Sequence, residues 1–209
     1  RAMNTARDLK DYFTYDEYAK WEDNERWELI GGSPRAMSPA PNIRHQRIVK
    51  RLAVAMEKSL EGKKCELMLS PCDLKLSAED VLQPDLMVVC DPDQIKENYV
   101  EGPPTLVVEV LSPNSLSRDM LEKLQLYARF SIPEYWIVTP FPSFVTVYSL
   151  DGETYRAIGG ANGDEVLTSP AFPKLEIDLT PIFDFPLTDE EKAIMQLRLC
   201  EPQTSRYGS

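Results

Sequence analysis

The segment Leu106-Val107-Val108-Glu109-Val110-Leu111 decides how we interpret this 209-residue chain. Its apolar residues would occupy both faces of an extended strand, a pattern typical of a central strand that is covered on both sides. Leu86-Met87-Val88-Val89 shows the same pattern. Further strands are predicted by shorter apolar runs at residues 27–30, 67–69, 74–76, 135–138 and 144–148.

Helices are predicted around these strands. Apolar residues recur at helical spacing over residues 43–60 and 116–130. A hydroxyl residue stands three positions before a glutamate at 14–17 and again at 188–191, which is the spacing of a capping box at a helix start. The resulting order predicts an α/β fold with a mixed central β-sheet flanked by α-helices.

Length and composition indicate one domain of ordinary globular type. Apolar residues make up 43% of the chain and charged residues 27%, which excludes wholesale disorder. We expect a single domain over residues 1–209, with a core at about 12–185, a C-terminal helix at 188–200 and a frayed tail at 201–209.

The cysteines and the apolar runs bear on the cellular compartment. No apolar stretch is long enough to span a bilayer, and the N-terminus lacks the apolar core of a secretory signal. The spacings of Cys65, Cys72, Cys90 and Cys200 match no zinc pattern and no redox motif. We therefore expect a cytoplasmic protein whose thiols are reduced and structural.

Two carboxylates carry the chemistry that the strands suggest. Glu109 stands inside an apolar strand, and Asp85 follows Pro84 at the mouth of another. A buried carboxylate is costly unless an internal cation or a metal ion compensates it. Two acids on neighbouring strands, with the Val110 carbonyl as a further ligand, would suit Mg²⁺ or Mn²⁺. The alternatives are a Pro-Asp turn for Asp85 and an ion pair for Glu109.

Lys123 adds a cation near this pair. It falls at the shoulder of the apolar side of the predicted helix, next to Tyr127. Its ammonium would either turn toward a site at the top of the sheet, reach into solvent, or pair with Asp119 on the same helix.

These residues stand in stretches that resemble the Uma-type restriction endonuclease family of bacteria, within the PD-(D/E)XK nuclease superfamily. The resemblance runs in order from about Thr14 to Tyr148. It rests on Pro84-Asp85 and on the stretches TYDEYAKWEDNERWELIGG (14–32), SPAPNIRHQRIVKRL (38–52), VVEVLSPNS (107–115) and RDMLEKLQLYARFSIPEYWIV (118–138). It implies a restriction endonuclease-like core in which Asp85 and Glu109 bind Mg²⁺ or Mn²⁺ and Lys123 completes the catalytic set.

The chain departs from the superfamily pattern at two positions. The superfamily's lysine stands two residues after the acid, where this chain has Leu111, so Lys123 on the following helix takes its place. Gly31 stands where relatives often carry aspartate. The resemblance also makes Glu28 a candidate accessory ligand. It extends to His45, the only histidine, as a second candidate accessory residue. The alternatives are a solvent-facing strand residue for Glu28 and a capping or surface residue for His45.

Net charge argues against a protein that coats nucleic acid, because 23 basic and 34 acidic residues give −11. Residues 42–64 nevertheless carry seven bases and two acids, a local balance of +5. The residues of this strip that would face a nucleic-acid backbone are Arg44, Arg47, Lys50 and Arg51. An ordinary solvated helix face is the alternative. Tyr135 and Trp136 are expected to fill the core.

Three functions remain open on this reading. The first is a metal-dependent endonuclease that hydrolyses DNA. The resemblance implies a homodimer for this function, since many nucleases of the superfamily pair to cut both strands. The second is a catalytically inactive nuclease fold that serves as a binding or assembly module, which the acidic composition and displaced lysine favour. The third is a magnesium-dependent phosphodiesterase acting on RNA or a small phosphate ester.

Overall fold

The computed structural model describes residues 11–22, 25–37, 42–112 and 117–200. The side chains of residues 117–119 and 197–200 are outside this description. The predicted tail and the proposed pairing of Asp119 with Lys123 therefore lie outside the described residues. Within the described part of the chain, no helix is long and apolar enough to cross a membrane.

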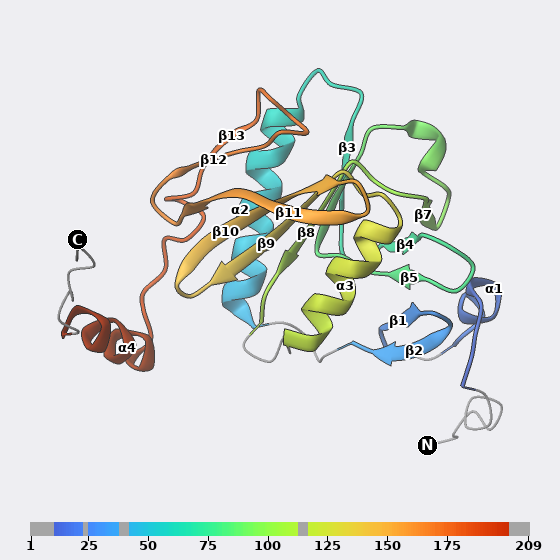
Figure 1. Cartoon of the computed structure of the whole chain (residues 1–209), viewed down its shortest axis with the longest axis horizontal. Helices are drawn as coiled ribbons and strands as arrows, with labels where there is room; N and C mark the ends of the chain where they lie inside the picture. The colour runs from blue at the N-terminus through green and yellow to red at the C-terminus, as the bar shows by residue number, and fades with distance from the viewer. Residues whose placement is uncertain (1–10, 23–24, 38–41, 113–116, 201–209) are drawn as a thin grey trace, which may run out of the picture.

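A six-stranded mixed sheet forms the centre of the fold (Figure 1). Its strands, in spatial order, are β11 (Thr154–Asn162), β10 (Ser143–Asp151), β9 (Glu134–Pro140), β8 (Leu106–Val110), β6 (Leu86–Val89) and β3 (Glu66–Leu69). Strands β8 and β9 are parallel, and the other neighbouring pairs are antiparallel. The predicted mixed sheet is thereby confirmed.

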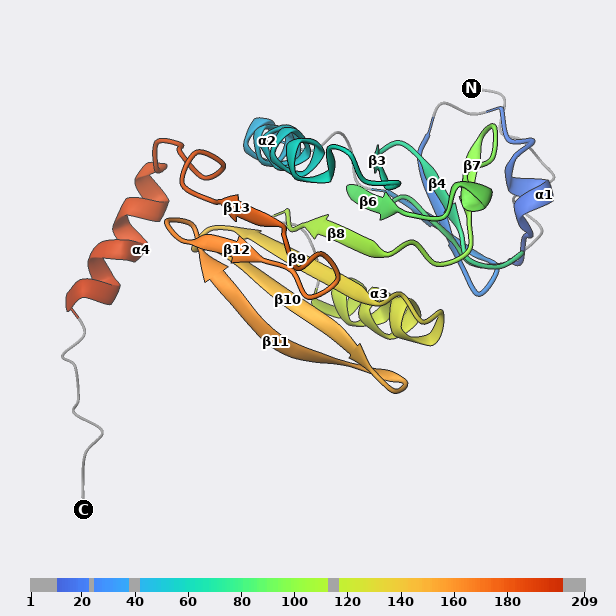
Figure 2. The ribbon, with the colours of Figure 1, turned by 90° about the horizontal axis from the view of Figure 1, so that it is seen from above.

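Two helices cover the opposite faces of this sheet, as Figure 2 shows. Helix α2 (Ile43–Leu60) packs on one face, and α3 (Ser117–Arg129) packs on the other. Alternation along β6 divides the strand between the two cores, with Leu86 and Val88 on the α2 side and Met87 and Val89 on the α3 side. The central strands β6, β8 and β9 are covered on both faces, which explains the continuous apolar runs in the sequence.

A second, five-stranded sheet lies beside the first. It consists of β2 (Ser33–Ala36), β1 (Trp27–Ile30), β5 (Val81–Leu82), β4 (Asp73–Lys75) and β7 (Tyr99–Glu101), with α1 (Tyr15–Tyr18) and a 3₁₀ turn η1 (Pro92–Gln94) around it. Sequence analysis missed β2, β5 and β7. These strands are only two to four residues long, too short to show a period.

The C-terminal part adds a small ribbon and a helix. Strands β12 (Val166–Thr168) and β13 (Glu176–Asp178) pair with each other, and α4 (Asp189–Cys200) extends away from the sheet (Figure 2). Buried Glu134 fastens the chain after β12. Its Oε1 accepts hydrogen bonds from Trp136 Nε1 at 2.6 Å and Ser169 Oγ at 2.7 Å, and its Oε2 accepts from the Ala171 amide at 2.7 Å.

The helices begin and end close to the predicted residues, and Tyr135 and Trp136 are buried as predicted. The expectation of reduced thiols is wrong for two cysteines, because Cys65 and Cys90 form a disulfide. Glu66 pairs with Val89 at the end of the antiparallel β3–β6 ladder. Cys65, just before β3, therefore lies opposite Cys90, just after β6. This cross-strand register depends on the fold and cannot be deduced from cysteine spacing. Cys72 is free.

Candidate functional site

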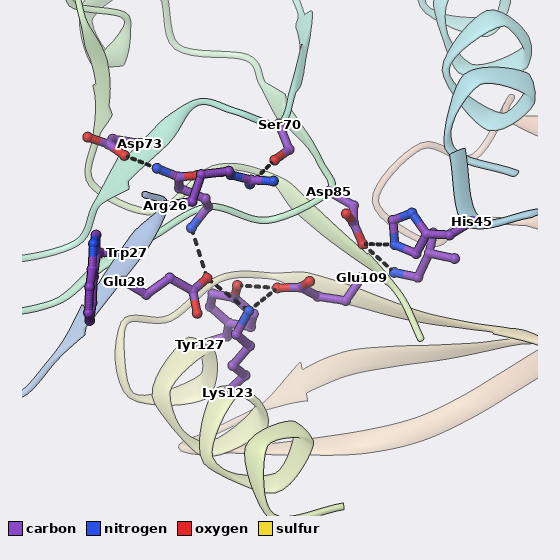
Figure 3. Close-up of polar contacts among 12 residues, drawn as sticks. Arg26, Trp27, Glu28, His45, Ser70, Asp73, Asp85, Glu109, Lys123 and Tyr127 are labelled. Carbon is purple, nitrogen blue, oxygen red and sulfur yellow. Dashed lines mark hydrogen bonds and ion pairs between the residues drawn. The ribbon is translucent and has the colours of Figure 1, made fainter. Parts of the chain in front are cut away.

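Asp85 and Glu109 lie across from each other on neighbouring strands. Leu86 pairs with Val108 in the antiparallel β6–β8 ladder, so the next pair along is Asp85 and Glu109. Opposed residues of such a ladder place their Cβ atoms roughly 4.5–5.5 Å apart. The β-sheet therefore brings together the two acids that the sequence singled out, as Figure 3 shows.

Glu109 faces helix α3 and is held by two of its side chains. Lys123 Nζ donates to Glu109 Oε1 at 3.1 Å, and the Tyr127 hydroxyl donates to the same oxygen at 2.9 Å. Lys123 also donates to Glu28 Oε1 at 2.9 Å, and this oxygen accepts a further bond from the Gln83 amide at 3.0 Å. Lys123 is only 8% exposed, so its ammonium does not reach into solvent.

Asp85 is held from the opposite side of the sheet. Its Oδ2 accepts a hydrogen bond from the Val110 amide at 2.8 Å and lies 3.2 Å from His45 Nε2. The ionised carboxylate can only accept, so Nε2 carries the proton of this contact. His45 belongs to the first turn of α2 and is buried. Among the described residues, its Nδ1 has no hydrogen-bond partner.

Burial dominates the electrostatics of the cluster. It raises the pKa of Glu109 to about 7, with Lys123 opposing this rise and Asp85 and Glu28 adding to it. Burial also lowers the pKa of Lys123, but attraction to Glu109 and Glu28 outweighs burial, and its pKa lies well above the ordinary value. When all three carboxylates are ionised and His45 is neutral, the three carboxylates and one ammonium carry a net charge of −2.

The donor set fits a hard divalent cation. Asp85 Oδ1 and Glu109 Oε2 accept no hydrogen bond from the described residues, so each acid keeps one oxygen available. The backbone of Val110 lies beside His45, whose pKa it helps to raise. Within the described ranges, however, no three His, Cys, Asp or Glu side chains are grouped closely enough to hold a metal. A metal here would keep several waters, as Mg²⁺ commonly does.

The predicted basic strip is divided between two environments. Arg44 pairs with Glu191 and donates to the Pro186 carbonyl. Arg51 donates to the carbonyls of residues 182 and 184. The guanidinium groups of both arginines lie over the Phe185 ring. Arg47 and Lys50 are exposed. Arg44 and Arg51 thus bind the C-terminal segment, which the helical pattern alone does not reveal.

Sequence reasoning missed the polar roles of Tyr127 and Gln83. The helical pattern puts Tyr127 on the apolar side of α3, yet its hydroxyl donates to Glu109. Its position four residues after Lys123 puts both on one helix face, which is the feature that indicates a shared partner. Gln83 precedes Asp85 by two residues and contacts Glu28 through its backbone, and no local pattern reveals that contact.

The fold is shared with the crystal structure, at 1.96 Å resolution, of a putative nuclease belonging to DUF820 from Anabaena variabilis ATCC 29413. The TM-score is 0.66 at 17% identity, over 81% of this chain and 97% of that chain.

The family follows from the sequence. The model of the Uma2 family, described as putative restriction endonuclease, matches residues 15–180, and the chain belongs to this family. The uncharacterized protein slr1290 of Synechocystis sp. (strain ATCC 27184 / PCC 6803 / Kazusa) is 34% identical over 116 residues. That match covers 54% of this chain and 60% of the relative's length. Family membership confirms the resemblance and supports a nuclease function in general.

Proposed function

We propose that this protein is a metal-dependent endonuclease that hydrolyses phosphodiester bonds of DNA. One observation carries the proposal. Asp85 immediately precedes β6 and Glu109 lies in β8, one step beyond the last pair of the β6–β8 ladder, each with an oxygen that accepts no hydrogen bond from the described residues, while Lys123 contacts Glu109. The family description as restriction endonuclease favours DNA as the substrate.

Asp85, Glu109 and the Val110 carbonyl are the groups that would hold Mg²⁺ or Mn²⁺. When bound, such an ion polarises a phosphoryl oxygen and lowers the pKa of a coordinated water. The protein contributes the direction of the ligands. The Val110 amide and His45 form hydrogen bonds with Asp85 Oδ2, and Lys123 and Tyr127 donate hydrogen bonds to Glu109 Oε1. Both acids are thereby fixed with one oxygen each for the ion.

Lys123 is positioned to act on the substrate. An ammonium has three N–H groups. Two of those on Lys123 donate to Glu28 and Glu109, and one remains. This remaining N–H would orient the attacking water or offset charge that develops on the phosphoryl oxygens. Glu28 keeps the ammonium in place, which makes it a positioning residue in this account and leaves its predicted role as an accessory ligand untested.

The partners and location in this proposal follow the sequence. DNA is a transient substrate, a homodimer would allow both strands to be cut, and the cytoplasm is the compartment where the substrate is met. The net charge of −11 opposes tight binding to a polyanion. An inactive binding or assembly module is the competing function, and the same experiment separates the two.

A plasmid nicking assay with Mg²⁺ and Mn²⁺ tests the proposal. The wild type is compared with Asp85→Ala, Glu109→Ala and Lys123→Ala, and with Glu101→Gln as a control at an exposed glutamate paired with Lys75. We expect the three site variants to lose roughly 10²–10³-fold in rate and the control to match the wild type. Labelled RNA, in a parallel reaction, tests the substrate class.

Two results would contradict the proposal. A wild type without metal-dependent cleavage of either nucleic acid would favour the binding or assembly module. Equal cleavage by all five proteins would indicate a contaminating nuclease and remove the site assignment.

A further inference from the structure

Arg26 lies beside the acid cluster formed by Glu28, Asp85, Glu109 and Lys123, and the proposed hydrolysis does not use it. Its Nε donates to Gln83 Oε1 at 2.9 Å, and its Nη2 donates to Ser70 Oγ. We infer that Arg26 binds a backbone phosphate of the nucleic acid, next to the phosphate that is cut. This inference rests on the proposed nuclease function and names the group that would position its substrate.

Both residues that hold the guanidinium are fixed to the backbone of the site. The Ser70 amide donates to the Asp85 carbonyl at 3.1 Å, and Gln83 precedes Asp85 by two residues. The Gln83 amide in turn donates to Glu28 Oε1 at 3.0 Å. Figure 3 shows Arg26 between Ser70 and Glu28, on the side of the cluster nearest the small sheet. The arginine is thus placed against the segment that carries Asp85.

Strand geometry directs Arg26 and Glu28 to the same side. The Arg26 carbonyl accepts from the Met37 amide at 2.9 Å, which extends the β1–β2 ladder by one step beyond β1. Residues two apart on a strand project to the same face. Glu28 reaches Lys123 from this face, so Arg26 projects from the same face of the chain as Glu28.

The charge of Arg26 is not matched by a direct ion pair with any described carboxylate. Its two hydrogen-bond acceptors, Gln83 and Ser70, are neutral, and its Nη1 makes no hydrogen bond within the described ranges. Asp73 lies near enough for Arg26 to oppose the rise of its pKa caused by burial. The Asp73 carboxylate, however, accepts from the Gln83 amide group at 2.9 Å and from the Tyr18 hydroxyl at 3.2 Å.

A fixed guanidinium with a free N–H edge suits phosphate. Arginine presents a rigid planar fork of donors, and phosphate oxygens accept from it. Gln83 and Ser70 hold one edge of this fork in place, so little further ordering is needed when a ligand binds. The position also answers the electrostatic objection, since a cation beside the acid cluster offsets its repulsion of a polyanion.

Binding of a fluorescein-labelled DNA duplex, measured by anisotropy over a range of salt concentrations, tests this inference. Ca²⁺ replaces Mg²⁺ so that binding can be followed without relying on turnover. The proteins are the wild type, Arg26→Gln, Arg26→Lys and Arg156→Gln. Arg156 is the matched control, because it is an exposed arginine paired with Asp151 on the β10–β11 hairpin. Thermal melting of each variant reports whether the fold is retained.

We expect Arg26→Gln to weaken binding at low salt by about 5- to 50-fold and to reduce the slope of log affinity against log salt by about 1. Arg26→Lys keeps the charge and should keep the slope, and Arg156→Gln should match the wild type. A purely structural role for Arg26 would lower the melting temperature and leave the salt slope unchanged.

The outcomes separate this inference from the proposed function. If the wild type binds and cleaves DNA and Arg26→Gln has the same salt slope as the wild type, the inference is overturned and the nuclease function stands. A reduced slope in Arg26→Lys would also overturn it, because the charge would not be the cause. Absence of both duplex binding and cleavage in the wild type would overturn the proposed function, and the inference with it.

Discussion

Two buried glutamates on adjacent strands of one sheet have opposite environments. Glu109 of β8 and Glu134 of β9 are separated by only a few residues along a parallel ladder. Both oxygens of Glu134 accept hydrogen bonds from neutral donors, and the side chain is 1% exposed. Glu109 shares one oxygen between Lys123 and Tyr127, and its side chain is 14% exposed.

Hydrogen bonding distinguishes the structural Glu134 from the candidate metal ligand Glu109. Every acceptor of Glu134 is used to fasten the chain at Ser169 and Ala171. Glu109 keeps an oxygen without a hydrogen bond from the described residues, and burial raises its pKa to about 7. Unused bonding capacity at a costly position indicates a ligand that the chain alone does not supply.

The largest expected effect is on cleavage. Glu109→Gln should reduce the rate of plasmid nicking by roughly 10²–10³-fold, because the amide removes the charge that would bind the cation. Glu134→Gln should cleave at a rate within about twofold of the wild type once the folded fraction is matched. A comparable loss of activity in both variants would contradict the assignment of different roles to Glu109 and Glu134.

The next effect is on stability. Glu134→Gln places an amide NH₂ among three donors, Trp136 Nε1, Ser169 Oγ and the Ala171 amide. Loss of satisfied hydrogen bonds at a buried site costs about 1–3 kcal/mol. We expect a decrease of this size in the free energy of unfolding, measured by urea titration. Ser169→Ala serves as a partial control, since it removes only one of the donors.

The acidity of Glu109 predicts an unusual dependence of stability on pH. Its pKa lies at about 7 in the metal-free folded protein and near 4.5 when unfolded. The folded state therefore binds more protons between these values, and stability should rise as pH falls from about 7 toward about 4.5. Urea unfolding of metal-free protein across this range should show a weaker rise for Glu109→Gln. An identical pH dependence in both proteins would contradict the assignment.

The smallest expected effect concerns Arg44, the predicted DNA contact that the structure ties to Glu191. Its side chain is 20% exposed and that of Glu191 13%. Partly exposed pairs of this kind contribute up to about 1 kcal/mol. Arg44→Gln should lower unfolding free energy by this amount at most and leave the salt dependence of DNA binding unchanged. A reduced salt dependence would restore Arg44 as a DNA contact.

The sequence revealed Glu109 and concealed Glu134 for a physical reason. Glu109 interrupts an apolar run, so its cost is visible locally. Glu134 precedes the apolar residues 135–138 and follows Pro133, a position typical of a loop end. Its partners lie 35 and 37 positions away. Contacts of that range depend on how the chain folds back, and no local period records them.

The range of the contacts also explains which other elements and contacts could be predicted from the sequence. The long helices and central strands were predictable because each buries a continuous apolar face. The small sheet was predictable only in part: β1 and β4 were expected, whereas β2, β5 and β7 were not, because they are short and held by neighbours distant in sequence. The Lys123 contact with Glu109 joins consecutive elements and was foreseen as one alternative. Arg26 was not foreseen, since its position depends on Gln83 and Ser70.

Isothermal titration calorimetry with Mg²⁺ and Mn²⁺ measures metal binding at Asp85 and Glu109. We expect saturable uptake of one ion by the wild type and by Glu134→Gln, and loss of that uptake in Asp85→Asn and Glu109→Gln. Metal uptake by these last two variants equal to that of the wild type, or none by the folded wild type, would contradict the claim that Asp85 and Glu109 bind a divalent cation.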